Sequence, residues 1–206
     1  NMVLPMVSAE VVRQSSYYPE GNAFVCVNGN NRYTRALYGS TAEWRVETSD
    51  RPIFATYKKS QTGNIRFRIS DGRQTMWLDE AEYCKASYEA GRRDYLLKDR
   101  RWGKGELDIS VLAFPDTEGA VWRFTVSGFD NRKLKVEAVL SQTVVPKPVR
   151  SGDIGSFLKP GTFEPATSET SVLGSVSRLS PGSIFYFSVD GENQLSTDET
   201  EKMQAR

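Results

Sequence analysis

The sequence predicts an all-β protein in which two antiparallel sheets form a β-sandwich with very little helix. Between about residue 23 and residue 145, short segments alternate apolar and polar residues with a period of two, as strands with one buried face do. Gly, Asp, Asn and Pro separate these segments at short intervals, which favours hairpins and meanders over βαβ crossovers. With 206 residues, 38 % of them hydrophobic, the chain can bury a sizeable core, and we expect residues 1–206 to form one domain.

The first clear strand is expected in NRYTRALYG, residues 31–39. Side chains alternate across a strand, so Arg32 and Arg35 would point to opposite sides, which argues against a compact phosphate site in this motif. One face would carry Arg32, Thr34, Ala36 and Tyr38, and the other Tyr33, Arg35 and Leu37.

Later segments show a clear division into an apolar and a polar face, which predicts strands with one side in the core. The segments are EWRVET, GNIRFRIS, ELDISVLAF, AVWRFTVSG and KLKVEAVLS. Their expected core residues are Trp44, Val46, Ile65, Phe67, Ile69, Leu107, Ile109, Val111, Ala113, Trp122, Phe124, Val126, Leu134, Val136, Ala138 and Leu140.

Two longer segments, EYCKASYEA and RRDYLLKD, are expected to form strands joined at Gly91. Composition then changes near residue 145, where Pro, Gly and Ser become frequent, and we expect an irregular excursion at about residues 145–180. SIFYFSVD resumes the strand pattern, with Phe185, Phe187 and Val189 on the buried face.

One helix is expected, and it begins in STDETEKMQAR. Ser196 or Thr197 would cap its amino-terminal end, and Asp198 and Glu199 would lie favourably in the first turn of the helix dipole.

Composition excludes several classes of function. The 27 Lys and Arg residues nearly cancel the 26 Asp and Glu residues, so the overall field favours neither nucleic acid nor an anionic membrane. No apolar run approaches the roughly 20 residues that span a bilayer, and the amino-terminal residues lack a signal-peptide pattern. The chain has no histidine, which excludes Ser-His-Asp, Cys-His and His-based zinc chemistry within it, and it has no nucleotide-cradling glycine motif. We expect no cofactor, no metal, no nucleic acid partner and no membrane span.

The two cysteines, Cys26 and Cys84, are too few for a four-thiolate zinc site and are not spaced as CxxC. We interpret them first as small apolar core residues, with a disulfide and then a reactive thiol as alternatives.

Acidic residues give no catalytic assignment. Glycoside hydrolysis needs two carboxylates a few ångströms apart, and sequence alone does not place them. Asp79, Glu80 and Glu82 form an acidic run without the pattern of an EF-hand, so a calcium site there is the weaker interpretation. The other candidates are more simply turn residues or solvated strand residues: Asp94, Asp99, Asp108, Asp116 and Asp153.

Basic and aromatic residues are interleaved in GRRDYLLKDRRWGKG, residues 91–105, a mixture that binds nucleic acid or acidic polysaccharide in some proteins and forms an ordinary charged hairpin in most. Sugar rings stack on exposed aromatic side chains. Tyr95, Trp102, Arg100 and Arg101 are therefore candidates for contact with a carbohydrate or a partner domain. Tyr17, Tyr18, Tyr33, Tyr38, Trp77 and Trp102 are in loop-like or strand-edge contexts, where they are either exposed to a sugar or partly buried under a loop, whereas Trp44 and Trp122 fit the buried pattern.

The run NGNNRYTRALYGSTAEWRVETSDRPIFATYKKSQTGNIRFRI, residues 28–69, closely resembles the start of DUF4450, a family of large exported proteins of Bacteroidetes. NRYTRALYG, RVETSDRP and GNIRFRI carry the resemblance, and ELDISVLAF, AVWRFTVSG and SGDIGSF are compatible with it. The resemblance implies a carbohydrate-active protein in which an N-terminal β-supersandwich precedes a catalytic α/α barrel. It also implies polysaccharide utilisation in the periplasm or at the cell surface, and it carries over no catalytic residue.

The sequence thus favours a non-catalytic module that packs against a neighbouring catalytic domain and contributes to carbohydrate binding. Arg32 and Tyr38 join the contact candidates named above. A stand-alone carbohydrate-binding module and, less simply, a carboxylate-dependent glycosidase complete in this chain are the alternatives.

Overall fold

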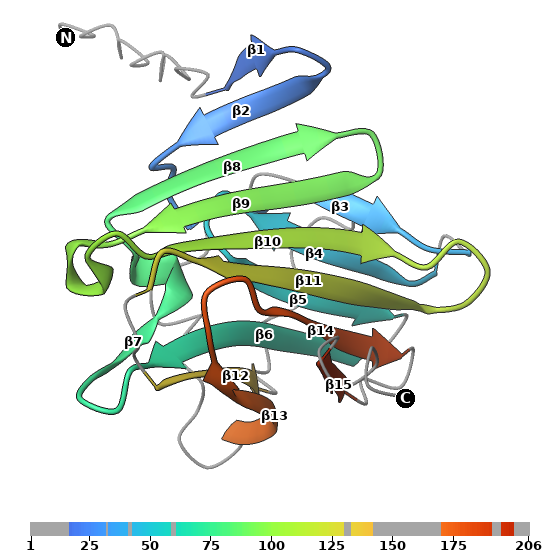
Figure 1. Ribbon diagram of the computed structural model, residues 1–206. Coiled ribbons are helices and arrows are strands. Elements are labelled where there is room, and N and C mark those ends of the chain that lie inside the picture. The colour runs from blue at the N-terminus through green and yellow to red at the C-terminus, as the bar shows by residue number, and fades with distance from the viewer. Residues whose placement is uncertain are drawn as a thin grey trace, which may run out of the picture.

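The computed structural model describes residues 17–31, 33–40, 43–58, 61–129, 133–141, 170–190 and 195–199. It shows two antiparallel sheets packed face to face, which confirms the predicted all-β sandwich (Figure 1). Within these ranges the only helical elements are two short 3-10 turns, η1 (Leu78–Glu80) and η2 (Arg100–Trp102). No helix among the described residues is long and apolar enough to cross a membrane.

The first sheet has eight strands, in the order β1-β2-β8-β9-β10-β11-β14-β15. Most neighbours in the sheet are also neighbours in the chain, as expected for hairpins and meanders. The strands are β1 (Tyr18–Glu20), β2 (Ala23–Val27), β8 (Tyr83–Glu89), β9 (Arg92–Lys98), β10 (Glu106–Ala113), β11 (Gly119–Ser127), β14 (Ile184–Asp190) and β15 (Leu195–Glu199).

The second sheet has seven strands, in the order β13-β12-β6-β5-β4-β3, with β7 paired to β6 outside this path. Its strands are β3 (Tyr33–Tyr38), β4 (Arg45–Ser49), β5 (Ile53–Lys58), β6 (Gln61–Ser70), β7 (Thr75–Trp77), β12 (Leu134–Ser141) and β13 (Thr170–Leu179).

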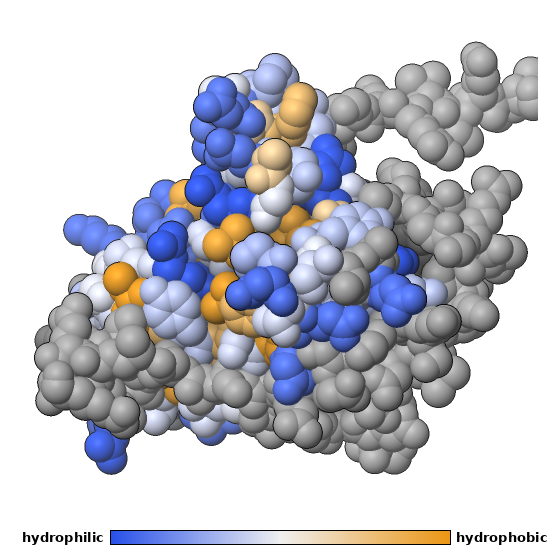
Figure 2. All heavy atoms as spheres, turned by 90° about the vertical axis from the view of Figure 1, so that its right-hand side faces the viewer, coloured by the Kyte–Doolittle hydropathy of each residue, from blue (hydrophilic) through white to orange (hydrophobic). Residues whose placement is uncertain are grey.

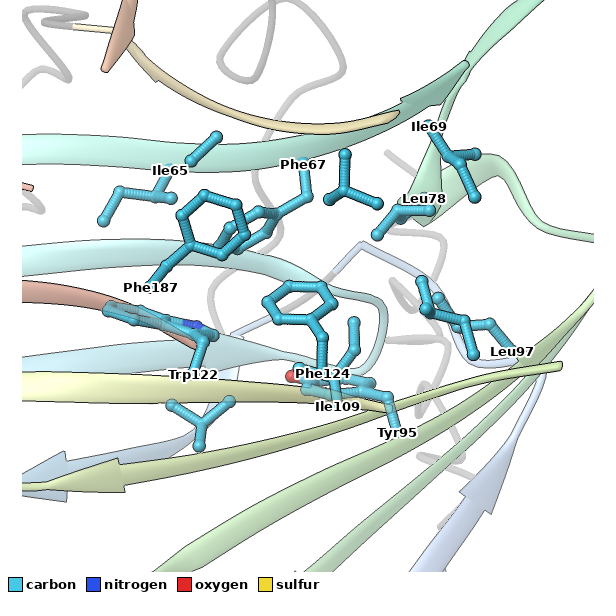
Figure 3. Close-up of a cluster of buried hydrophobic side chains, with 14 of the residues drawn as sticks. Ile65, Phe67, Ile69, Leu78, Tyr95, Leu97, Ile109, Trp122, Phe124 and Phe187 are labelled. Carbon is cyan, nitrogen blue, oxygen red and sulfur yellow. The ribbon is translucent and has the colours of Figure 1, made fainter. Parts of the chain in front are cut away.

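The core lies between the two sheets and is strongly aromatic (Figure 3). Phe67 on β6 packs against Phe124 on β11 with ring centroids 4.9 Å apart and against Phe187 on β14 at 5.4 Å. Trp122 and Phe54 meet edge to face across the sheets at 5.4 Å. Each such side chain contributes about 1.5–3 kcal/mol through removal of its surface from water. The predicted core faces are confirmed: Trp44, Val46, Ile65, Phe67, Ile69, Leu107, Ile109, Val111, Trp122, Phe124, Val126, Leu134, Val136, Ala138, Phe185, Phe187 and Val189 are buried.

Two predictions about the later chain need correction. Leu195–Glu199 is strand β15, paired with β14, so the predicted helix start at Ser196 or Thr197 is wrong. The irregular excursion was expected to reach residue 180, but Thr170–Leu179 is strand β13, paired with β12. In both segments pairing with an existing sheet edge satisfies backbone groups and overrides local sequence preference. Residues 142–169 lie outside the described part of the chain.

The turn at Gly91 is confirmed. Gly91 has φ +79° and joins β8 to β9 in a tight hairpin, where glycine takes a left-handed conformation without steric cost.

The two open sides of the sandwich differ. On one side β13 contacts β15, so the last strands of both sheets lie close together. On the other side β3 is the edge strand and contacts β10, and β1, β2 and part of β8 extend past it (Figure 1). Among the described residues no strand of the seven-stranded sheet lies beyond β3, so part of this overhang has no facing strand, although Cys26 on β2 and Cys84 on β8 are fully buried.

Candidate binding site

The predicted contact residues do not gather at one place. Tyr38 ends β3. The next residue, Gly39, packs against the loop between β10 and β11, since a Cβ placed on Gly39 would lie 3.2 Å from the carbonyl oxygen of Phe114. Arg100, Arg101 and Trp102 form η2 at the other end of β10. A strand rises about 3.3 Å per residue, so the eight residues of β10 separate the two groups by roughly 25 Å. Arg32 lies outside the described residues.

Tyr95 and Trp102 are buried, which contradicts the prediction that they offer ring faces to a sugar or a partner. Tyr95 is 1 % exposed and its hydroxyl donates a hydrogen bond to the Ser49 carbonyl at 2.6 Å. Trp102 is 4 % exposed and packs on Phe129. Alternation explains Tyr95, because it shares the inward face of β9 with Leu97.

The basic hairpin is neutralised by neighbouring acids. Arg100 pairs with Glu82 at 2.9 Å, and Arg101 pairs with Asp99 at 2.7 Å. The hydrogen bond from Arg101 holds the pKa of Asp99 below its ordinary value, although partial burial acts in the opposite direction. Both arginines remain at the surface, so their predicted contact role stays a prediction, but the segment is not an open positive patch.

Tyr38 is 55 % exposed and lies on the outer face of the seven-stranded sheet. Its neighbour across the strand pair is Arg45, whose guanidinium stacks over Tyr57 at 3.9 Å and pairs with Glu47. The contact role of Tyr38 also stays a prediction. Of the other aromatic residues in loop-like or strand-edge contexts, Tyr33 is buried and Tyr18 is exposed.

The acidic run does not form a cation site. Asp79 is buried and both of its carboxylate oxygens accept hydrogen bonds from Arg66, at 3.1 and 2.8 Å. Arg66 in turn stacks over Trp77 at 4.2 Å. In the described part of the chain no group of three or more His, Cys, Asp or Glu side chains is placed to hold a metal ion.

Cys26 and Cys84 are buried and free, which bears out their interpretation as core residues. Burial raises the pKa of Cys84 to about 12 and raises that of Cys26 as well, so neither thiol ionises near neutral pH. Thiolate chemistry therefore finds no support.

The unforeseen feature is a group of polar side chains buried between the sheets, which we name the buried polar network: Tyr17, Thr34, Asp50, Arg93 and Tyr95. Arg93 is fully buried, and its Nη2 donates to the Asp50 carboxylate at 3.0 Å and to the Ser49 carbonyl at 2.8 Å. The hydroxyls of Tyr17 and Thr34 donate to the same oxygen of Asp50. The Arg93 Nε donates to Tyr95 at 3.3 Å.

Burial fixes the protonation of this network. Burial raises the pKa of the Tyr17 phenol, and the Asp50 carboxylate raises it further, while the charge of Arg93 lowers it. Burial also raises the pKa of Tyr95. For Arg93, burial alone would lower the pKa, but the oxygens of Tyr95 and Tyr17 raise it above its ordinary value. The phenols stay neutral donors and the arginine stays charged, so the network holds positions and does not transfer protons near neutral pH.

The network positions a second group, which we name the aromatic shelf: Tyr17, Phe24, Arg35 and Tyr88. The guanidinium of Arg35 lies between two rings, 4.6 Å from the centroid of Tyr17 and 5.2 Å from that of Tyr88. Phe24 is directly opposite Tyr88 in the β2–β8 pair, so both side chains are on the same face, and Phe24 is 51 % exposed. Phe24 and Tyr88 belong to the overhang, and Arg35 reaches Tyr88 from β3.

Local pairing explains how β3 presents Arg35 inward. The β3–β4 register shifts between Tyr33 and Arg35, so Tyr33 turns outward, whereas Arg35 and Leu37 face the other sheet. Simple alternation placed all three on one face. The sequence did indicate the inward position of Arg93, since Arg93, Tyr95 and Leu97 alternate on one side of RRDYLLKD. Because a charged residue is rarely buried, alternation alone did not identify Arg93 as a core residue.

A small hollow near Trp102 is not a sugar site. It is lined by one buried tryptophan edge, two polar residues and three apolar residues, and it has room for about one water molecule. The lining residues are Ile69, Asp71, Gln74, Met76, Trp102 and Leu134.

The fold and the buried ion pair define a β-sandwich domain that holds a polar network at one side. Residues 60–164 match the family described as Domain of unknown function (DUF4450), and since this is half of the chain, the protein belongs to DUF4450. The match overlaps only the last ten residues of the 28–69 stretch that suggested the family, and it includes the ELDISVLAF and AVWRFTVSG strands. No curated protein matches the chain.

Proposed function

We propose that this domain is a non-catalytic β-sandwich module of a glycan-processing protein and that it packs against a neighbouring domain. The supporting observation is the outer face of the eight-stranded sheet. Alternation normally places polar residues on such a face, yet Leu112 is 43 % exposed there and Ile184 is 37 % exposed. Val27 and Tyr18 add exposed apolar surface on the same face.

Several charges on this face are already paired with one another. Arg92 pairs with Asp94 at 2.8 Å, and Lys98 pairs with Glu106 at 2.7 Å. A partner that covers Leu112 and Ile184 would therefore not leave these charges without partners. Such a mixture of apolar and paired polar groups is typical of interfaces between domains of one chain.

The occupant that fits this face is a domain that follows in the same polypeptide. β15 is the edge strand of the eight-stranded sheet and pairs with β14, which carries Ile184. Glu199 is opposite Phe185, next to Ile184, so a domain joined near this point would have a high effective concentration at this face. The resemblance to proteins with a catalytic α/α barrel supports the same arrangement and, with it, export to the periplasm or the cell surface.

Association with the following domain tests the proposal. The chain and the segment encoded after it are produced separately, mixed and analysed by sedimentation velocity. We expect a one-to-one complex that the Leu112→Glu, Ile184→Glu double variant abolishes and the Arg73→Glu control, in the exposed loop between β6 and β7, retains. A gene that encodes no following domain, or a complex that tolerates the double variant, would contradict the proposal.

The non-catalytic part has its own test. Asp94 and Asp108 lie on the same outer face, and Asp94 is occupied by Arg92 and by the hydroxyl of Ser110. Partial burial raises the pKa of Asp108, and Glu106 and Asp94 raise it further. If the purified chain cleaved a glycan and Asp94→Asn or Asp108→Asn abolished the turnover, the domain would be an enzyme in itself.

A stand-alone carbohydrate-binding module is the second candidate, and the exposed ring of Phe24 beside Tyr88 favours it. Screening of the chain against neutral and acidic polysaccharides distinguishes the two. Binding that is lost in Phe24→Ala or Tyr38→Ala supports a binding module, whereas a flat response across the panel leaves the docking role.

A further inference from the structure

We propose that the aromatic shelf binds the carboxylate of an acidic sugar, a uronic acid residue, with the guanidinium of Arg35 as its ligand. This inference deepens the carbohydrate-binding candidate, on which it rests, and it is independent of the docking role. The docking face belongs to the outer side of the eight-stranded sheet, whereas the shelf lies on the inward faces of β2, β8 and β3.

Arg35 has donors that the fold does not use. Its Nη1 donates to the carbonyl of Thr34 at 2.7 Å, and among the described residues it has no carboxylate partner. By contrast, three arginines at the surface of the eight-stranded sheet and its η2 turn, Arg92, Arg100 and Arg101, are in ion pairs. A planar guanidinium with free donors matches the two oxygens of a carboxylate.

Asp50, the acid of the buried polar network, is already occupied by other donors and does not neutralise Arg35. Asp50 already accepts hydrogen bonds from Arg93, Tyr17 and Thr34. Arg51, the residue after Asp50, donates to the backbone carbonyls of Gly29 and Ala81 and adds a further positive charge. Arg35 and Arg93 lie 4.6 and 5.9 Å from the centroid of the Tyr17 ring, and Asp50 is the one carboxylate of the network and the shelf together, so this group has an excess of positive charge that attracts an anion.

A buried donor strengthens the excess. The Nη1 atom of Arg93 is buried and has no hydrogen-bond partner among the described residues. Burial of an unsatisfied charged donor is unfavourable, and an anion bound nearby lowers that cost through its field. An anion on the shelf would therefore reduce the free-energy cost of burying the Arg93 donor.

The rings around Arg35 select a sugar over a simple anion. Tyr17 and Tyr88 hold the guanidinium by cation–π contacts and restrict its rotation, so less entropy is lost when a ligand binds. The exposed ring of Phe24, opposite Tyr88, offers an apolar face on which a pyranose ring stacks while its carboxylate reaches Arg35. Figure 2 looks at the molecule from the right-hand side of Figure 1 and shows hydrophobic side chains next to strongly hydrophilic ones among the described residues.

Calorimetric titration of the 206-residue chain tests the proposal. The probes are tetragalacturonate, a neutral galactose tetrasaccharide of the same linkage, and an acetylated peptide that ends in a free carboxylate. We expect tetragalacturonate to bind at least about 10-fold more tightly than either of the others. We expect Arg35→Gln to weaken it about 10-fold, Arg35→Lys to weaken it less, and Phe24→Ala to weaken both saccharides alike.

Arg92→Gln is the matched control, because Arg92 is exposed on the outer face of the eight-stranded sheet and its loss should leave the affinity unchanged. Equal binding of the charged and the neutral tetrasaccharide would overturn the uronate inference while the carbohydrate role stood. Binding of none of the saccharides would overturn both, and tighter binding of the peptide would assign the shelf to a protein carboxylate. Thermal melts of each variant keep a loss of folding from being scored as a loss of binding.

Discussion

The space between the two sheets holds two regions of opposite character. Between β6, β11 and β14 the contacts are aromatic, with Phe67, Phe124 and Phe187 packed within 4.9 to 5.4 Å of one another. Between β3, β4 and β9 the same interlayer space holds the Arg93–Asp50 ion pair. An aromatic interior stabilises a fold by area alone, whereas a buried ion pair stabilises it little relative to apolar residues of the same volume. The polar region therefore calls for another explanation, and support of the aromatic shelf supplies one.

The largest change in the free energy of unfolding is expected when the Arg93–Asp50 ion pair is removed. Arg93→Met leaves the carboxylate of Asp50 buried without its cation and should lower the free energy of unfolding by about 3–5 kcal/mol. Addition of Asp50→Asn should restore more than half of the loss, since the amide still accepts from Tyr17 and Thr34. Urea denaturation of the three proteins measures both values. The adjacent Arg92→Gln serves as the control and should change the stability by less than about 0.5 kcal/mol.

Alkaline pH should also act on the polar region. Free tyrosine and cysteine side chains lose their protons near pH 10.0 and 9.0, but burial raises the pKa of Tyr17, Tyr95 and Cys84 in the folded chain. The unfolded chain releases these protons first, so stability is complete below about pH 9 and falls as the pH rises, by about 1.4 kcal/mol for each unit of raised pKa. Denaturation midpoints between pH 8 and pH 11 check this. A profile that stayed level would show that these groups titrate normally.

A smaller effect isolates one hydrogen bond of the network. Tyr95→Phe removes the hydroxyl that donates to the Ser49 carbonyl but keeps the ring that packs on Phe54, so the loss should be about 1 kcal/mol. The variant should also flatten the alkaline profile. Unchanged stability together with an unchanged profile would mean that Tyr95 acts through its ring alone.

An effect of similar size, but confined to stability, is expected in the apolar region. Ile109→Val removes one buried methylene from β10 and should cost about 1 kcal/mol without altering the alkaline profile or the affinity of the shelf for tetragalacturonate. Chemical denaturation and calorimetry check the two quantities. A change in affinity would show that the two regions are coupled, against the division of roles described here.

The sequence predicted the apolar region well and the polar region poorly. Period-two alternation identified Phe67, Trp122 and Phe187 as core residues because area burial depends only on which face a residue occupies. The same rule put Arg93 on an inward face. Whether a charged residue is buried there depends on a partner, Asp50, that is distant in the sequence, and alternation does not reveal it.

The candidate site escaped prediction for similar reasons. Arg35 faces inward because the register shifts beside it, and its neighbours Tyr17 and Tyr88 come from other strands. Composition instead drew attention to Trp102 and Tyr95, which packing buries. The helix expected at Ser196 failed because the edge of β14 offered backbone partners. Local patterns determine faces, whereas long-range pairing determines sites.

The most direct test of the central claim, that the polar region supports a site on the shelf, is an NMR titration of the chain with tetragalacturonate. We predict that four sets of signals shift together and saturate: the side-chain Nε of Arg35, the backbone amides of Phe24 and Tyr88, and the aromatic protons of Tyr17. Signals of Arg92, Arg100 and Arg101 should stay in place. Shifts centred on those three arginines, or no shift at Arg35 at saturating saccharide, would contradict the claim.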